Sequence, residues 1–164
     1  ATPNGTVNID GGGNITFTPT ANYNGTETFP YVITDGTVTA TANEIITINP
    51  IVDVVDDIAT TNEQAPVVID VFANDNDVPT TGTITTTQPT NGVVVITDPN
   101  NTPNDPSDDV VTYTPNADYN GTDTFEYTIC DANNVCDTAE VEVTVSPTVD
   151  AVDDVATTDE DAPV

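Results

Sequence analysis

Carboxylate side chains gather in short segments of the sequence, and these segments are the best placed to do chemistry. Asp56 and Asp57 are adjacent, Glu63 follows, and residues 74–77 read Asn-Asp-Asn-Asp. Adjacent carboxylates repel by about 1 kcal/mol per close pair in water and by several times more at a half-buried surface. The chain has 28 Asp and Glu residues but no Lys, Arg or His, so no basic side chain can relieve this repulsion. We therefore expect these acidic segments to recruit cations.

The ligand chemistry favours calcium. The candidate ligands are carboxylate and amide oxygens, and the chain has no imidazole, so a hard ion is indicated. Clustered Asp and Asn suit the flexible coordination of Ca²⁺ better than the strict octahedron of Mg²⁺. Extracellular calcium would fill even sites with a Kd of roughly 10⁻⁴ to 10⁻³ M. The ligands expected at the first of these sites are Asp53, Asp56, Asp57, Glu63, Asp75 and Asp77.

An internal repeat returns these acids at a fixed distance. Residues 53–67 recur as residues 150–164, 97 positions later (150 − 53), and residues 17–29 closely match residues 113–125. Such periodicity is typical of a tandem array. We expect the end of one repeat over 1–49, a complete repeat over 50–146 and the start of a third over 147–164, as a window from a longer protein. The equivalent acids of the third repeat are Asp150, Asp153, Asp154, Glu160 and Asp161.

The position of the acids predicts where calcium would act. Asp53, Asp56 and Asp57 follow Pro50, between the end of one repeat and the first strand of the next. Asp35 and Asp131 lie in the hairpin before the last strand of their repeats, and we expect them to approach the following joint. The hypothesis is a Ca²⁺ ion that bridges two domains, and the alternative is a solvated acidic linker.

A second candidate is an insertion at residues 98–109. Its oxygen-bearing side chains are spaced somewhat like those of a calcium loop, but Pro103 stands where an EF-hand requires Gly. An exposed hairpin stiffened by proline explains the segment equally well. The candidate ligands here are Asp98, Asn100, Thr102, Asn104, Asp105 and Asp109.

The composition excludes several functions. Nucleic acids and anionic membranes attract basic surfaces, whereas this chain has a formal charge of −28. Most enzyme chemistry uses His, Lys or Arg as proton shuttle, amine or phosphate clamp, and all three are absent. No apolar stretch approaches the roughly 20 residues that cross a bilayer. We expect a non-enzymatic protein without nucleic-acid binding or direct membrane insertion.

The pattern of the remaining sequence predicts an all-β fold. Apolar and polar residues alternate with a period of two, for instance Phe125, Tyr127 and Ile129 against Glu126. Short strands separated by Pro, Gly, Asn and Asp turns indicate tandem Greek-key β-sandwiches of immunoglobulin or cadherin type, with about seven strands per repeat. In the complete repeat we expect strands at 56–60, 67–72, 82–87, 93–97, 110–114, 124–130 and 135–145.

Two further features concern the sandwich itself. Tyr119 precedes a strand at a Greek-key corner, and we expect its hydroxyl to reach back to the backbone as in a tyrosine corner. Cys130 and Cys136 flank the last hairpin, and the first repeat has Thr34 and Thr39 at the aligned positions. Because both cysteines are replaced together, a Cys130–Cys136 disulfide is predicted, which implies an oxidising location outside the cytoplasm.

The motifs resemble those of a known family. The Val-Asp-Asp of the linker, Ala-Asn-Asp-x-Asp at 73–77, the segment at 113–125 and the cysteine hairpin are similar to cadherin-like tandem repeats of giant bacterial surface adhesins. The cysteine pair and the insertion are most similar to repeats from Bacteroidota, including flavobacterial gliding-motility adhesins of the SprB type exported by type IX secretion. Asp137-Thr138-Ala139 also resembles the O-glycosylation motif of that phylum, with Thr138 as the modified residue, and alternation within a strand explains the segment as well.

The resemblance implies a function. It implies a structural repeat of a long extracellular adhesin or cell-surface filament, in which calcium stiffens a rod that projects a distal binding region for attachment or gliding. Its partners would be neighbouring repeats of the same chain, with surface or glycan ligands bound by other parts of the protein. The alternative is a module that itself binds glycan or ice, since Thr83, Thr85 and Thr87 alternate along one strand.

Overall fold

The chain is built from β-strands, as the alternating sequence predicts. The structure is a computed structural model and describes residues 2–149, 151, 153–161 and 163. The complete repeat contains seven strands and one short 3₁₀ turn, η1 (Pro106–Asp108). The strands are β5 (Asp57–Asn62), β6 (Val67–Ile69), β7 (Gly82–Thr86), β8 (Gly92–Thr97), β9 (Val110–Pro115), β10 (Gly121–Asp131) and β11 (Cys136–Ser146).

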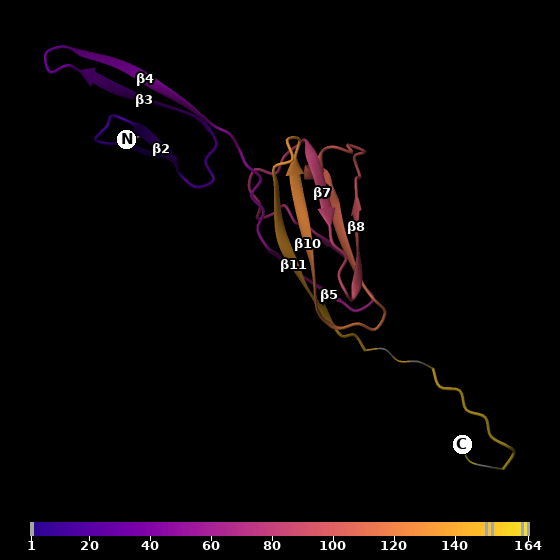
Figure 1. Ribbon diagram of the computed structural model, residues 1–164. Coiled ribbons are helices and arrows are strands. Elements are labelled where there is room, and N and C mark those ends of the chain that lie inside the picture. The colour runs from indigo at the N-terminus through magenta and orange to yellow at the C-terminus, as the bar shows by residue number, and fades with distance from the viewer. Residues whose placement is uncertain (1, 150, 152, 162, 164) are drawn as a thin grey trace.

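These strands form the two layers of a sandwich (Figure 1). One sheet has the order β5-β11-β10-β7 and the other the order β6-β9-β8. Neighbouring strands are antiparallel except β5, which runs parallel to β11. The all-β sandwich is therefore confirmed, and each of the seven expected strands has a counterpart. Within the described residues no helix is long and apolar enough to cross a bilayer.

The core lies between the sheets and follows the period of two. The inward residues of β10 and β11, such as Tyr127, Ile129 and Val143, are completely buried. Glu126 and Glu142 alternate with them and face solvent. Because successive side chains of a strand point to opposite faces, one pattern supplies both the apolar core and the acidic surface.

The first repeat is represented by two hairpins. They comprise β1 (Gly5–Ile9) with β2 (Ile15–Pro19), and β3 (Gly25–Thr34) with β4 (Thr39–Ile48). Phe17 and Phe29 stack at a centroid distance of 6.2 Å, and Tyr113 and Phe125 stack at 6.5 Å in the complete repeat. This shared geometry supports the repeat alignment. The inner face of the hairpins is open, and the described residues after Ser146 form no strand.

Tyr119 uses its hydroxyl to fix the turn before β10. The hydroxyl donates to the carbonyl oxygen of Thr122 at 2.6 Å. The acceptor lies three residues downstream, so the expected bond to an upstream carbonyl was wrong. Gly121 has φ of +133°, and a Cβ there would lie 3.2 Å from the Tyr119 hydroxyl oxygen. The turn therefore requires glycine, because L-residues rarely adopt this conformation.

The predicted disulfide is present. Cys130 and Cys136 are directly opposite each other in the β10–β11 pair and are bonded, with their Cα atoms 4.0 Å apart. In the first repeat Thr34 and Thr39 occupy the same register in the β3–β4 pair. The bond therefore reinforces a hairpin that forms without it elsewhere in the chain.

Removing the disulfide should lower the stability without preventing folding. The variant Cys130→Thr/Cys136→Thr installs the residues of the first repeat, and we expect its unfolding free energy to fall by about 2 kcal/mol, because the closed loop is short. Urea unfolding followed by circular dichroism measures this difference. An unchanged midpoint would show that the bond contributes nothing to the folded state.

Candidate functional site

Acidic segments that are distant in the sequence meet at one end of the sandwich. The linker and the 74–77 loop are joined by backbone hydrogen bonds between Asp53 and Asn76. The insertion reaches the start of β7, where the Gly82 N–H donates to the Asn104 carbonyl. The β10–β11 hairpin is at the same end, with Asp131 beside the 77–80 loop. The hairpins of the first repeat lie on this side (Figure 1), so we call this end the joint pole.

Acidic side chains hold the linker to the sandwich at the joint pole. The Val54 N–H donates to Asp137 Oδ2 at 3.0 Å, and the Val55 N–H donates to Asp75 Oδ1 at 2.8 Å. Sequence reasoning missed Asp137 as part of this cluster. The register of β4 against β3 places Ala40 at the equivalent position of the first repeat, so the repeat alignment gave no signal for it.

At the joint pole, the fold disfavours the ionised form of Asp57. Its Oδ2 atom is buried and has no hydrogen-bond partner. Burial raises the pKa of Asp57 to about 6, and the charges of Asp75, Asp70 and Asp56 add to the effect. Burial also raises the pKa of Asp75. A cation at this position would relieve both carboxylates, because an opposite charge stabilises the ionised form.

Because the pKa of Asp57 is raised, we expect the contribution of this residue to folding stability to decrease as the pH rises. In the folded state Asp57 binds its proton more tightly than the unfolded value of 3.8 allows. Its contribution to stability is therefore complete below about pH 4 and is lost as the pH rises through about 6. Without calcium, Asp57→Asn should be more stable than the parent near neutral pH, and the difference should shrink on acidification.

The measurement is urea unfolding of both proteins across this pH range. Repulsion among the other acids also lowers the unfolding free energy as the pH rises. The effect of Asp57→Asn must therefore be compared with that of a control substitution. Glu142→Gln removes an equal charge from an exposed outward position of β11 and is the matched control. A difference between Asp57→Asn and Glu142→Gln that does not vary with pH would contradict the prediction.

The Tyr127 hydroxyl lies among carbonyl and carboxylate oxygens of the joint pole. It is 3.1 Å from the carbonyl oxygens of both Val55 and Val71, and 3.0 Å from Asp75 Oδ1. Burial, followed by the charges of Asp75 and Asp57, raises the pKa of this hydroxyl. It therefore stays protonated and offers a single hydrogen to several acceptors. The cluster thus contains an excess of oxygen lone pairs, which is the electrostatic setting of a cation site.

Two of the expected ligands have other contacts. Glu63 lies at the opposite end of β5 from Asp57, and six residues of strand span roughly 20 Å. Its Oε1 accepts hydrogen bonds from the N–H and hydroxyl of Thr148, which hold the chain leaving β11. The structure therefore separates Glu63 from the linker acids. Asp56 Oδ1 accepts the Glu140 N–H at 2.9 Å and joins the linker to β11.

A direct contact connects the two repeats. The Asn24 side chain of the first repeat donates to Asp77 Oδ1 at 2.6 Å. A cavity of about 230 Å³ lies beside this contact, lined by residues of both repeats that include Tyr23, Asn49, Pro50 and Asp53. Asp53 and Asp77 are therefore expected ligands that lie at the surface between the repeats.

The hairpin acids take a different place from the one expected. Asp131 lies beside Asn24, Pro50 and Asp77, which is the joint with the preceding repeat. The expectation that it approaches the following joint was wrong, because β11 must cross the whole sandwich before the chain leaves. Asp35 and Asp131 each accept two backbone N–H groups of their own turns, and these bonds lower the pKa of both carboxyls.

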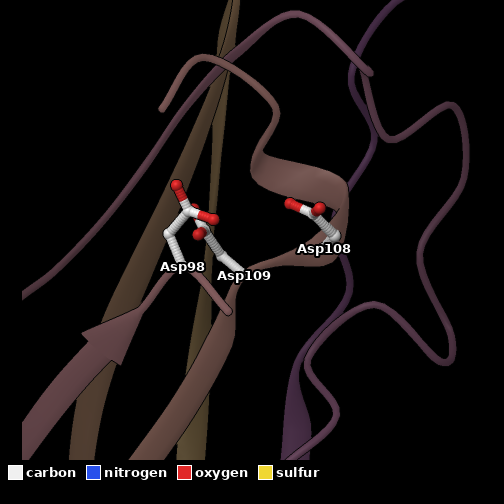
Figure 2. A group of neighbouring side chains, drawn as sticks. All are labelled: Asp98, Asp108 and Asp109. Carbon is white, nitrogen blue, oxygen red and sulfur yellow. The ribbon is translucent and has the colours of Figure 1, made fainter. Parts of the chain in front are cut away.

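The insertion forms a compact group of three carboxylates. Asp98 follows β8, Asp109 precedes β9 and Asp108 lies on η1, facing the other two (Figure 2). Their ligand oxygens lie within 4.8 Å of one another, and they are the only such triad within the described residues. We call this group the insertion triad. It could bind a metal ion, whereas the linker acids do not form an equally close group.

The three carboxylates of the insertion triad have different environments. Asn100 and Thr102 donate to Asp108 at 2.7 and 2.9 Å, and Asp98 Oδ1 is buried without a hydrogen-bond partner. Burial and the charges of Asp98 and Asp108 raise the pKa of Asp109. Sequence reasoning missed Asp108 and included Asp105, which instead accepts the N–H and hydroxyl of Ser107. Asp108 is adjacent to Asp109, a pairing that could have drawn attention to it.

The remaining candidates are exposed. Asp153, Asp154, Glu160 and Asp161 lie on a segment without strands, and Asp150 lies outside the described residues. The Thr138 hydroxyl is exposed and lies 2.8 Å from that of Thr128, and its glycosylation stays a prediction. Thr83, Thr85 and Thr87 are exposed along β7 and beyond it, although the Thr87 hydroxyl accepts the Glu126 N–H.

Comparison with known proteins identifies both repeats. A family model described as a bacterial Ig domain matches residues 1–49 and again residues 48–144. The two matches together cover most of the chain and agree with the repeated strand pairs. No curated protein matches the chain.

Proposed function

The chain belongs to the bacterial Ig domain family, and from this premise we propose that it is a structural repeat of a long extracellular adhesin or cell-surface filament. In this role the tandem sandwiches form a rod that Ca²⁺ stiffens and that projects a distal binding region. The rod itself contributes reach, and surface or glycan ligands are bound by other parts of the protein.

One observation carries the proposal. Acids from the linker, the 74–77 loop, the insertion and the last hairpin converge on the joint pole, in a chain without a single basic residue. Where strand ends gather carboxylates that no side chain can neutralise, bound cations offset the repulsion. A cation held by Asp53 and Asp77 would reduce bending between the repeats, because both lie beside the contact with Asn24.

The location is consistent with this role. Bacterial Ig domains and a disulfide together indicate a protein outside the cytoplasm. Calcium concentrations there would fill sites with a Kd of roughly 10⁻⁴ to 10⁻³ M. Within this proposal, the protein stands on the surface of a cell of the Bacteroidota and is exported by type IX secretion, and the resemblance of the cysteine hairpin and the insertion to gliding-motility adhesins supports this part of it.

Small-angle scattering of the protein with calcium and with EGTA tests the proposal. With calcium we expect a narrower range of interdomain angles, a longer maximum dimension and a higher melting temperature. Because we expect calcium to bind at the joint, Asp53→Asn/Asp77→Asn should lose most of the calcium-dependent increase in maximum dimension.

The matched control is Glu126→Gln/Glu142→Gln, which removes the same charge from exposed outward positions of β10 and β11 that lie outside the Asn24–Asp77 contact. It should retain the calcium response of the parent. If neither the maximum dimension nor the melting temperature responds to calcium, the calcium-stiffened rod is wrong. If both double variants lose the calcium response equally, calcium acts only by screening the overall charge and not by binding at the joint.

A further inference from the structure

The three-stranded sheet of the complete repeat has no acidic residue on any of its strands. β6, β8 and β9 contain no Asp or Glu, although the chain has a formal charge of −28. The other sheet carries acids on several of its strands. In the three-stranded sheet the acids occur only beyond the strand ends, at Asp70, Asp98 and Asp109.

The outer face of this sheet is formed by β-branched side chains. Val68 is 64% exposed, and Val93 and Val95 are each 50% exposed. Thr112 lies between Val68 and Val95 in the register, and Thr114 lies opposite Val93. We call these five residues the valine face. The first repeat keeps the same face free of charge, with Thr and Asn at the exposed positions of β1 and β2.

The β8 edge of this sheet is obstructed at Val94. β8 is an edge strand and reads Gly-Val-Val-Val-Ile-Thr, which would invite pairing with another chain. The Gln88 side chain occupies this edge, because its amide nitrogen donates to the Val94 carbonyl at 2.9 Å and its oxygen accepts the Val94 N–H at 3.0 Å. Contact through the face is therefore less obstructed than strand pairing at the β8 edge.

We propose that the valine face is the surface through which a second copy of this chain docks, face against face. Two chains of charge −28 repel strongly, and burying an unpaired carboxylate between them is costly. A second copy can approach closely only where both surfaces lack acids, and the three-stranded sheet meets this condition. A two-fold axis brings identical faces together.

The docking is weak for one repeat and becomes effective through repetition. The valine face comprises only five side chains, which is small for a stable interface. In a tandem array an acid-free face recurs on every repeat that has no Asp or Glu on these strands, as the first repeat does, so the second and later contacts form at high effective concentration. Lateral association of parallel rods is the consequence, and it is separate from the calcium-dependent stiffness of a single rod.

Sedimentation velocity over a range of protein concentrations in EGTA tests the docking. We expect the parent to associate reversibly, and the association to strengthen as salt rises, because screening reduces the repulsion between the chains. Val93→Asp/Val95→Asp should lower the association constant at least tenfold. Concentration-dependent chemical-shift changes of the parent should map to β6, β8 and β9, so the test does not depend on that variant folding.

Two matched variants identify the surface. Ile58→Asp adds a charge at a residue of the other sheet that is 86% exposed, and Ile33→Asp adds one at the open face of the first repeat, where the residue is 62% exposed. Both should associate nearly as the parent does. A monomeric parent at every concentration, shift changes outside the three-stranded sheet, or an association that Ile33→Asp abolishes would overturn the proposal.

Discussion

Replacing Tyr127 with phenylalanine is expected to lower the unfolding free energy of the complete repeat by about 3 kcal/mol, near the upper end for a single buried polar group. The hydroxyl is the donor shared among Val55, Val71 and Asp75, and the phenol ring is completely buried. Removing it leaves the buried carbonyl of Val71, the partly buried carbonyl of Val55 and the carboxylate of Asp75 without that donor. The linker and the loop after β6 would then lose the group that holds both to β10.

Urea unfolding at neutral pH measures the loss, and Tyr119→Phe is the matched control. The Tyr119 hydroxyl makes one exposed bond to Thr122, so its removal should cost about 1 kcal/mol or less. If the two variants are equally stable, the Tyr127 hydroxyl is not the centre of the joint pole. Calcium should stabilise Tyr127→Phe less than the parent, because the carboxylates that the hydroxyl orients would be misplaced.

Neutralising two carboxylates of the insertion triad is expected to weaken calcium binding about 100-fold, equivalent to about 2.8 kcal/mol. The variant is Asp98→Asn/Asp108→Asn, which keeps the size of both side chains and removes two of the three charges that lie within 4.8 Å of one another. The affinity of Ca²⁺ sites depends strongly on the number of charged ligands. Isothermal titration with calcium gives the affinity directly.

Asp105→Asn is the control for the insertion triad. Asp105 belongs to the same segment but accepts hydrogen bonds from Ser107 at the start of η1, so its neutralisation should change calcium affinity little. Equal losses in Asp105→Asn and Asp98→Asn/Asp108→Asn would mean that the segment attracts calcium only through its overall charge. In the absence of calcium, Asp98→Asn/Asp108→Asn should be at least as stable as the parent, since repulsion is removed.

The fold was largely predictable because its signals are local. Alternation in β10 and β11 states which residues face the core, and turns rich in Gly, Asn and Pro state where strands end. The first repeat has Thr34 and Thr39 where the complete repeat has Cys130 and Cys136, and this joint replacement indicated the disulfide. The repeat alignment adds evidence because the same strand pairs occur twice in one chain.

The candidate site was less predictable because it depends on which strand ends meet. Asp137 lies 83 residues from its linker partner Val54, and nothing in its neighbourhood indicates that contact. Glu63 is close to Asp57 in sequence but is separated from it by the whole of β5, since a strand carries its two ends to opposite poles. Asp131 lies at the preceding joint because the hairpin turns before the chain crosses back.

Composition, periodicity and repetition are properties of the chain alone, so they were enough to predict an acidic tandem array of sandwiches without basic side chains. The tertiary structure decided which carboxylates become neighbours. Asp98 and Asp108 join Asp109 because β8, η1 and β9 end together, and Asp57 is strained because the sandwich buries one of its oxygens. Electrostatic energy depends on distance and burial, and only the folded chain fixes these two quantities.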